Sequence, residues 1–220
     1  MKKYHKAQIK NAPWNKGKAV GQMTPFTPEQ AQVIRSLLTT EKKIRDVALF
    51  NVGIDTMLRA SDLLRLSTAD VTDHQGDVVS EINIRQKKTN RGHLVALSSE
   101  TRDSLADWIL HSGKKQEDFL WTSIGNRKTK TRIGNQEIER HLTREQYANL
   151  VKQWAYLARL DPKRHSTHSM RRTKSSVIYD KTQNLAACQQ LLGHKSIGST
   201  ALYLGVDQRK ALDLAKRIKI

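Results

Sequence analysis

Apolar residues recur at helical spacing immediately after a helix-start signal at residues 27–30. There a threonine precedes a proline, and a glutamine follows three residues after the threonine, which is typical of a capped helix with proline at its first position. Four aliphatic residues then fall on one helical face, at Val33, Ile34, Leu37 and Leu38. A second capping signal at residues 143–146 predicts a helix whose apolar positions are Tyr147, Leu150, Val151, Trp154 and Leu157.

Two shorter patterns predict helices between these signals. One helix is expected from Ile44 to about Gly53, where the glycine indicates a break. Residues 59–66 open the next helix, with Ser61 as its expected N-cap. Arg59 therefore lies at a turn-to-helix junction, from which a side chain can point out of the core.

A hairpin is predicted in the middle of the chain. Residues 78–86 alternate between apolar and polar as a strand does, residues 87–92 have the composition of a turn, and residues 93–97 form the return strand. Helices dominate elsewhere. The pattern predicts a mainly α fold with a small antiparallel β-sheet.

The second half of the chain contains one long basic connection. Ser99 is the expected cap of a helix that ends near Leu110, and residues 123–142 are favoured as a surface loop, with a contact to DNA as the alternative. From Thr167 onward the pattern indicates several short helices.

The charge of the chain changes what partners are expected. Lys and Arg number 39 against 21 acidic residues, a net charge of +18, which favours a polyanionic partner, although secreted cationic and ribosomal proteins share this property. The single cysteine, Cys188, allows no intrachain disulfide, which fits a reducing cytosol. No signal peptide and no run near ~18 apolar residues is present, so we expect a cytoplasmic protein with no membrane partner.

The chain divides into a short arm and one domain. Residues 1–22 are basic and poor in aliphatic residues, which indicates either a disordered tail or an arm that lies on DNA phosphates or docks through Trp14. Residues 23–220 form the expected domain, which includes an amphipathic helix at 207–218 that packs either on its own core or on a neighbouring subunit.

Five short motifs in order carry the chemistry. They are Thr56-Met-Leu-Arg59-Ala-Ser-Asp, Gln86-Lys-Lys-Thr, His168-Ser-Met-Arg171, Leu191-Leu-Gly-His194 and Thr200-Ala-Leu-Tyr203. Together they resemble the boxes of the tyrosine recombinase, or phage integrase, family, across roughly residues 26–211. The resemblance implies the catalytic-domain fold of that family, and the short chain is similar to its catalytic-domain-only members or to a fragment of a longer protein.

The residue types suit reaction at a phosphodiester. Such a reaction needs a nucleophile, cations on the non-bridging oxygens and a proton for the leaving oxygen. No convincing carboxylate cluster for metal ions is present, and His165 with His168 lacks the further ligands of a zinc site. Two arginines, Arg59 and Arg171, can grip a phosphate with their planar forks.

The resemblance implies a role for each remaining site residue. Tyr203 is the expected nucleophile; the alternative is a buried tyrosine that is hydrogen-bonded at its tip. Lys88 is the expected general acid for the leaving 5′-oxygen, because adjacent strand residues point to opposite faces and Lys87 and Lys88 cannot share one role. His168 and His194 are expected to bind the phosphate oxygens or to move protons.

Further basic residues are predicted to contact DNA. They are Lys87, Arg91, Arg127, Lys128, Lys130, Arg132 and Arg172. Many family members have a histidine at the position of Arg172, so this arginine is either an additional phosphate contact or a surface charge.

The resemblance implies that double-stranded DNA is cleaved through a 3′-phosphotyrosyl intermediate and rejoined, with no metal, ATP or other cofactor. It further implies a monomer alone and a homotetramer on DNA, with room for accessory DNA-bending proteins. Type IB topoisomerases and telomere resolvases share the chemistry, but Leu-Leu-Gly-His and the compact size favour a recombinase. The alternatives are a non-catalytic, sequence-specific DNA-binding protein of the same fold and a basic RNA-binding protein.

Overall fold

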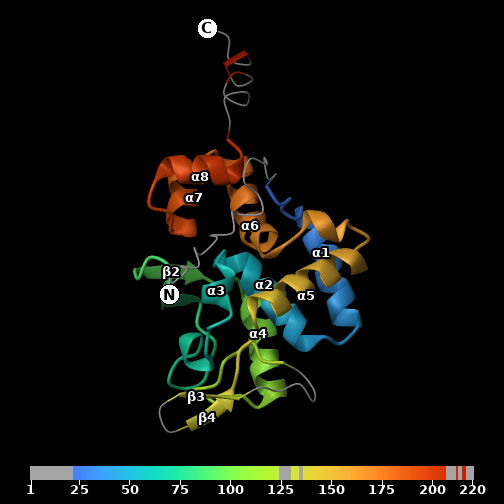
Figure 1. The fold of residues 1–220 in the computed structure, drawn as a ribbon, viewed down its shortest axis with the longest axis vertical. Coiled ribbons are helices and arrows are strands. Elements are labelled where there is room, and N and C mark those ends of the chain that lie inside the picture. Colours follow the sequence, from blue (N-terminus) through green and yellow to red (C-terminus); the bar gives the residue numbers. More distant parts are fainter. Residues whose placement is uncertain (1–21, 124–129, 134–135, 207–211, 213–214, 217–220) are drawn as a thin grey trace, which may run out of the picture.

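The protein folds as a helical body with a smaller group of three helices above it. The computed structural model describes residues 22–123, 130–133, 136–206, 212 and 215–216. In Figure 1, α6, α7 and α8 lie above the body, and α2 lies in its middle. No helix in the described part of the chain is long and apolar enough to span a membrane.

The body is built around a helix that is buried on nearly all sides. This helix, α2 (Ile44–Thr56), packs against α1 (Pro28–Thr40) and α4 (Ser99–Ser112), and α5 (Arg144–Leu157) packs against α1. Aromatic rings fill the space between them, since the Phe50 ring meets the Trp154 ring edge-on at a centroid distance of 5.5 Å. The body therefore provides a rigid base for the elements above it.

The capping signals located two helix starts correctly. Thr27 and Thr143 each accept a hydrogen bond from the backbone three residues on, and the glutamine at that position bonds back to the threonine N–H. Two other caps were wrong by one or two residues: Arg59, not Ser61, is the N-cap of α3 (Ala60–Leu63), and Ser98, not Ser99, caps α4. Ser98 takes the cap because its hydroxyl accepts from the Thr101 N–H.

The sequence predicted a helix break at Gly53, but α2 continues through this residue. A Cβ at this position would lie 2.8 Å from the Tyr147 hydroxyl oxygen, so the glycine permits α5 to pack closely against α2. The helix ends instead after Thr56, where Met57 adopts a left-handed conformation with φ of 50°.

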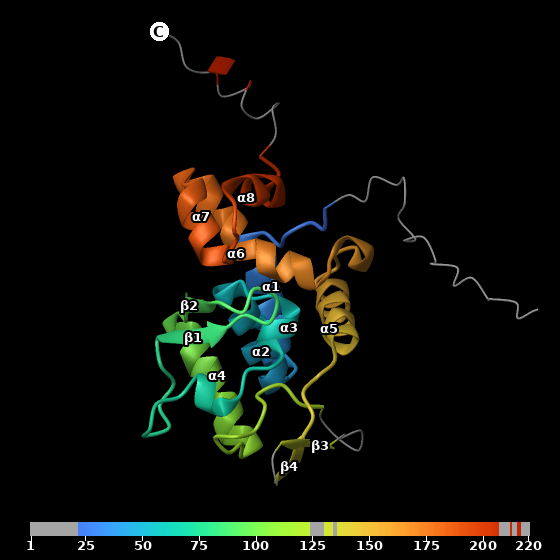
Figure 2. The same cartoon turned by 60° about the vertical axis from the view of Figure 1, so that its left-hand side comes forward.

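The predicted hairpin is present and a second one accompanies it. Strands β1 (Glu81–Arg85) and β2 (Gly92–Ala96) pair antiparallel, with Asn83 opposite Leu94 (Figure 2). Strands β3 (Lys130–Ile133) and β4 (Gln136–Glu139) form another two-stranded sheet inside the connection that was predicted as a loop. The mainly α fold with small antiparallel sheets is thus confirmed, and the loop prediction for these two segments was wrong.

The C-terminal region contains the three upper helices. They are α6 (Thr167–Thr182), α7 (Leu185–Leu192) and α8 (Ile197–Leu204). Two are short, as predicted, whereas α6 is as long as the body helices and packs on α2. Two 3₁₀ turns, Thr68–Asp70 and Pro162–Arg164, complete the elements. Most of the predicted helix at 207–218 and residues 1–21 of the predicted arm lie outside the described residues.

Candidate active site

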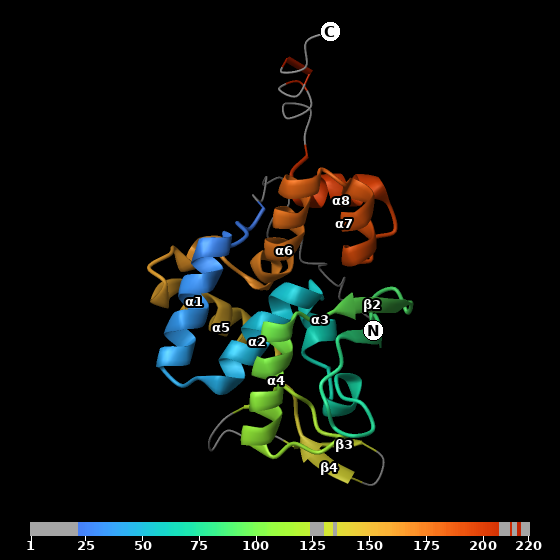
Figure 3. The ribbon, with the colours of Figure 1, turned by 180° about the vertical axis from the view of Figure 1, so that it is seen from behind.

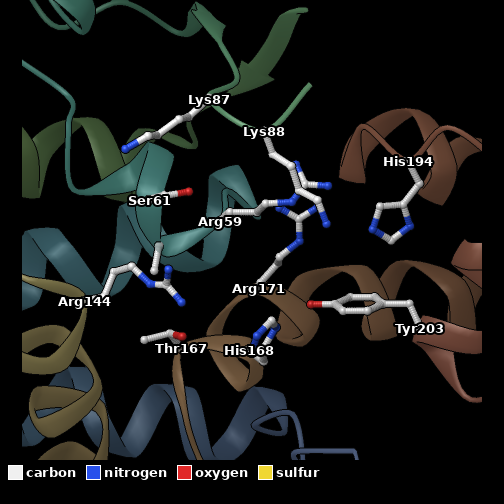
Figure 4. Close-up of a pocket in the computed structure, with 11 residues that line it drawn as sticks. Arg59, Ser61, Lys87, Lys88, Arg144, Thr167, His168, Arg171, His194 and Tyr203 are labelled. Atoms are coloured by element: carbon white, nitrogen blue, oxygen red, sulfur yellow. The ribbon is translucent and has the colours of Figure 1, made fainter. Parts of the chain in front are cut away.

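A single cavity of about 590 Å³ gathers side chains from distant parts of the chain. It is bounded by α3, by the turn that follows β1, by the first turns of α5 and α6, and by the region from the end of α7 to α8. All six residues predicted as catalytic line it, namely Arg59, Lys88, His168, Arg171, His194 and Tyr203 (Figure 4). Among the described residues, no acidic side chain lines this cavity.

Arg59 is held at the start of α3 by a buried glutamine. Its backbone is extended, with φ of −66° and ψ of 145°, and it precedes the first helical residue, so the side chain leaves the helix axis. Its Nη1 donates to the Gln86 side-chain oxygen at 3.1 Å. Gln86 is only 2 % exposed, and Thr89 donates to the same oxygen. The hairpin turn therefore orients Arg59 without neutralising its charge.

Arg171 is a buried cation without a carboxylate partner. It is 3 % exposed, and its Nη2 donates to the Leu192 carbonyl at the end of α7. Burial lowers the pKa of its guanidinium to about 10, which leaves it charged at neutral pH. In the described part of the chain no carboxylate lies within ion-pair distance of Arg171 or Arg59.

The Tyr203 hydroxyl points into the cavity (Figure 4). This oxygen is buried and forms no hydrogen bond with any described residue that meets the usual geometry. The ring lies edge-on to His194 at a centroid distance of 5.2 Å, and the Arg171 guanidinium lies 5.9 Å from its centre. Burial raises the pKa of the phenol, and the nearby arginines oppose this rise.

The two histidines reach the cavity from two helix ends. His168 stands in the first turn of α6, and His194 follows the left-handed Gly193 that ends α7. The His194 Nδ1 is 3.1 Å from the Thr200 hydroxyl, which fixes the ring. Burial, then Arg171 and Arg59, lowers the pKa of His194 to about 4, and the pKa of His168 is lowered for similar reasons. Both rings are thus kept neutral by a site that is already cationic.

The two lysines of the hairpin lie in its turn and not in its strand. Lys87 and Lys88 both line the cavity, but they point in different directions in Figure 4, with Lys88 toward the arginines. The Lys87 backbone N–H donates to the Asp62 carboxylate at 3.0 Å, which ties the turn to α3. The expected divergence of the two side chains therefore holds, although turn geometry rather than strand alternation produces it.

The other predicted DNA contacts are dispersed. Arg91 is exposed and lines a smaller cavity beside the first one, and Lys130 is exposed in β3. Arg127, Lys128 and the side chain of Arg132 lie outside the described residues. Arg172 is only 8 % exposed, so the surface-charge alternative was wrong.

Four residues that line the cavity were not predicted as site residues, namely Ala60, Ser61, Arg144 and Thr167, and Arg144 is the most informative of them. Its guanidinium points into the cavity from the start of α5, near Thr167 and Ser61 (Figure 4). A cation in the first helical turn opposes the helix dipole, and this unfavourable position was the available signal. The capping box placed Arg144 at a helix start, but the pattern could not show which elements that start would meet.

This arrangement is suited to bind an anion next to a hydroxyl. Two arginine forks and a lysine can neutralise the non-bridging oxygens of a phosphate, and neutral imidazoles can accept or donate a proton there. The buried phenol oxygen of Tyr203 lies beside these cations.

Comparison with known sequences gives a consistent family. The phage integrase family model matches residues 26–210. A probable integrase/recombinase of Bacillus subtilis, YoeC, is 28% identical over 190 residues, which covers 82% of this chain and 87% of the relative. The tyrosine recombinase XerD of Yersinia pestis is 29% identical over 164 residues, covering 74% of this chain and 50% of the relative. The chain spans about half the length of the XerD relatives it matches.

Solved structures share the fold. The XerA recombinase superposes with a TM-score of 0.67 at 18% identity, covering 90% of this chain and 66% of the other. The XerH site-specific recombinase bound to its difH substrate superposes with a TM-score of 0.65 at 18% identity, covering 90% and 55%. At this identity the likeness concerns the fold.

Proposed function

The chain belongs to the phage integrase family of tyrosine recombinases, and from this premise we propose that it is a site-specific recombinase that cleaves and rejoins double-stranded DNA through Tyr203. The observation that carries the proposal is the cavity itself. It joins a buried, unpartnered phenol oxygen to two arginines, a lysine and two neutral histidines, with no acidic side chain among the described lining residues.

The missing counter-charge supports a phosphate ligand. Burying a cation without a partner costs roughly several kcal/mol. Native proteins therefore usually pair a buried cation with an opposite charge. Among the described residues, Arg171 donates to the Leu192 carbonyl and Arg59 to the Gln86 amide oxygen, and neither has a carboxylate within ion-pair distance. A DNA phosphate placed between them supplies the anion that the protein omits. Fixed cations in a partly desolvated cavity also stabilise the additional charge of a pentacoordinate transition state.

In the proposed cleavage step, one phosphoester bond forms at Tyr203 as another breaks in the DNA. The Tyr203 oxygen attacks the phosphorus, and the bond from phosphorus to the 5′-oxygen breaks, leaving a 3′-phosphotyrosyl link and a free 5′-hydroxyl. The phenol proton passes to His168 or to solvent, since a neutral imidazole can accept it. One phosphoester replaces another of similar energy, so the chemistry draws on these side chains alone. Attack by a 5′-hydroxyl from another strand reverses the step and completes strand exchange.

Lys88 is the proposed general acid for the leaving oxygen. Its side chain extends toward the arginines in Figure 4, whereas Lys87 points elsewhere. The turn that carries Lys88 is anchored at Gln86 and at the Lys87 N–H, and these bonds hold the proposed proton donor beside Arg59.

The partners follow from the same proposal. Double-stranded DNA is the substrate, with Lys87, Arg91 and Lys130 as further contacts, and strand exchange between two duplexes requires four active sites in a homotetramer. The DNA-bound XerH structure that shares the fold supports DNA as the partner.

The deciding experiment is covalent capture. We expect the protein, incubated with a pool of duplexes that carry a nick beside a randomised segment, to form a denaturant-resistant protein–DNA adduct whose DNA can be sequenced. Tyr203→Phe should abolish the adduct, because it removes the attacking oxygen, while DNA affinity stays within about threefold.

Tyr156→Phe is the matched control, since that ring is 72% exposed and does not line the cavity. Adduct formation should be unchanged in it. An adduct that persists in Tyr203→Phe would show that another residue is the nucleophile. Specific DNA binding without any adduct in the unaltered protein would favour the non-catalytic alternative.

A further inference from the structure

The nucleophile helix is tied to a segment that precedes the first helix. This segment, residues 22–26, is named here the strap, and in Figure 3 it rises from the start of α1 beside α6. The Gln22 side-chain amide donates to the Leu202 carbonyl, next to Tyr203. The Thr24 N–H donates to the Arg164 carbonyl at 3.0 Å, and the Phe26 N–H donates to the Thr173 hydroxyl at 3.1 Å.

Arg172 connects the strap to the tyrosine. Its Nη1 donates to the Met23 carbonyl at 2.7 Å, and its guanidinium carbon lies 5.6 Å from the centre of the Tyr203 ring. The side chain is 8 % exposed and does not line the cavity, and its Nε is buried without a partner among the described residues. A side chain placed to contact DNA would lie open to solvent. Arg172 instead lies against the tyrosine ring.

The nucleophile helix packs mainly on the other helices of the upper group. Helix α8 packs on α7 and α6, and Leu202 on its outer side is 72% exposed. The Tyr203 ring therefore lies among Arg171, Arg172 and His194, and the only one of these three that is bonded to the strap is Arg172.

We propose that Arg172 is a positioning residue for Tyr203, and that the strap sets the position of the nucleophile through the bond from Arg172 to the Met23 carbonyl. The proposal rests on Tyr203 being the nucleophile. The sequence predicted that Arg172 contacts DNA. In this proposal Arg172 instead positions the Tyr203 ring. The proximity of its charge to the phenol also helps to counter the rise that burial imposes on the pKa of Tyr203.

The test compares Arg172→Met with the unaltered protein on the captured nicked duplex. We expect single-turnover cleavage at saturating DNA to slow by about 10- to 100-fold, since misplacing a reacting group by about 1 Å can cost that much. The dissociation constant for DNA should stay within about threefold. Arg65→Met, which removes the same charge from an exposed arginine, should leave the cleavage rate unchanged.

Weaker DNA binding with unchanged cleavage of bound DNA would overturn the proposal. If Arg172 contacts a phosphate, Arg172→Met weakens DNA binding and lowers the slope of log affinity against log salt by about 1, while cleavage of bound DNA is unchanged. Unchanged binding together with unchanged cleavage would also overturn it.

Two further variants keep the test decisive if Arg172→Met does not fold. Thr173→Val removes the acceptor for the Phe26 N–H and leaves every charge in place, and it should slow cleavage by about 3- to 10-fold at constant affinity, because the strap loosens. Arg172→Lys keeps the charge but loses the fork, and should show an intermediate rate.

A readout without DNA separates this proposal from the proposed function. In protein labelled with ¹³C at the tyrosine ring, the signal absent from Tyr203→Phe belongs to Tyr203. That signal should shift in Arg172→Met and begin to titrate at higher pH, because a cation that favours the phenolate is gone. An unmoved signal would refute the placement of Arg172, whereas a missing adduct with a shifted signal would refute only the nucleophile assignment.

Discussion

Arg171 and Lys174 stand almost one turn apart on α6 and are stabilised in opposite ways. Lys174 faces the body and forms an ion pair of 2.6 Å with Asp55, whose carboxylate also accepts from Ser98 and Thr101. Arg171 lines the cavity and donates to the Leu192 carbonyl, and no carboxylate of the described residues lies within ion-pair distance of it. One helix therefore carries, three residues apart, a cation neutralised by a carboxylate and a cation with no carboxylate within ion-pair distance among the described residues.

A buried cation of the body is paired in the same way as Lys174. The Arg45 guanidinium is paired with Asp46 at 2.6 Å, and the Trp154 indole N–H donates to the same carboxylate group. The buried carboxylates of Asp46 and Asp55 are thus each matched by a cation, which offsets the cost of burying them. The cavity departs from this pairing, and the departure indicates where a ligand anion belongs.

The largest expected effect is on cleavage, and it distinguishes Arg171 from Lys174. Arg171→Met should reduce single-turnover cleavage by about 1000-fold, because a preorganised charge on the phosphate is lost. Its free energy of unfolding should change by less than about 1 kcal/mol, since relief of the buried charge offsets the lost hydrogen bond.

Lys174→Met is the matched control on the same helix. It leaves Asp55 without its cation and should lower the free energy of unfolding by about 2 kcal/mol, a figure reduced for the partial exposure of Lys174. Cleavage by the folded enzyme should stay within about threefold. Equal losses of activity in the two variants would remove the distinction between Arg171 and Lys174.

The next comparison uses two glycines that end helices in the left-handed conformation. Gly113 ends α4 with φ of 62° and open space around it, whereas a Cβ on Gly193, with φ of 59°, would lie 2.5 Å from the Gln86 amide nitrogen. Gly113→Ala should cost only the conformational strain, about 1 kcal/mol. Gly193→Ala should cost about 1–3 kcal/mol more and slow cleavage at least about 10-fold, because Gln86 orients Arg59.

Urea unfolding and single-turnover cleavage measure both variants. Similar losses in the two would mean that the close approach of Gly193 to Gln86 is relaxed in solution.

The smallest effect concerns pH. The pKa of His194 is about 4 in the folded protein against 6.5 for the free side chain. Between these values the unfolded chain binds more protons, so the free energy of unfolding decreases as the pH falls from 6.5 to about 4. Burial alone would raise the pKa of Asp55, but Lys174 and neighbouring hydroxyls hold it below 3.8, so the contribution of this carboxylate persists until the pH falls below that value.

His194→Gln should flatten the slope of stability against pH between about 4 and 6.5, as measured by urea midpoints. A partial slope should remain, because the pKa values of His93, His165 and His168 are also lowered. An unchanged slope would show that His194 is as basic in the folded protein as in the unfolded chain.

Local patterns predicted the elements well where the signal was itself local. The capping boxes at Thr27 and Thr143 start helices as expected, because the bonds that define them join residues three apart. The helix break predicted at Gly53 was wrong, because the glycine serves instead a close contact with Tyr147 on another helix. The second hairpin was missed, since its two polar strands lack the apolar alternation by which a half-buried strand is recognised.

The amino-acid sequence alone determined the residue types of the site, their order along the chain, the helix starts beside them and the excess of positive charge. Only the tertiary structure decided which cations are neutralised and which are left for a ligand. The bond from Arg172 to Met23 spans 149 positions, and the pair of Lys174 with Asp55 spans 119. Periodicity shows which face of a helix is buried, but the partner across that face depends on how the whole chain packs, and no local pattern carries that information.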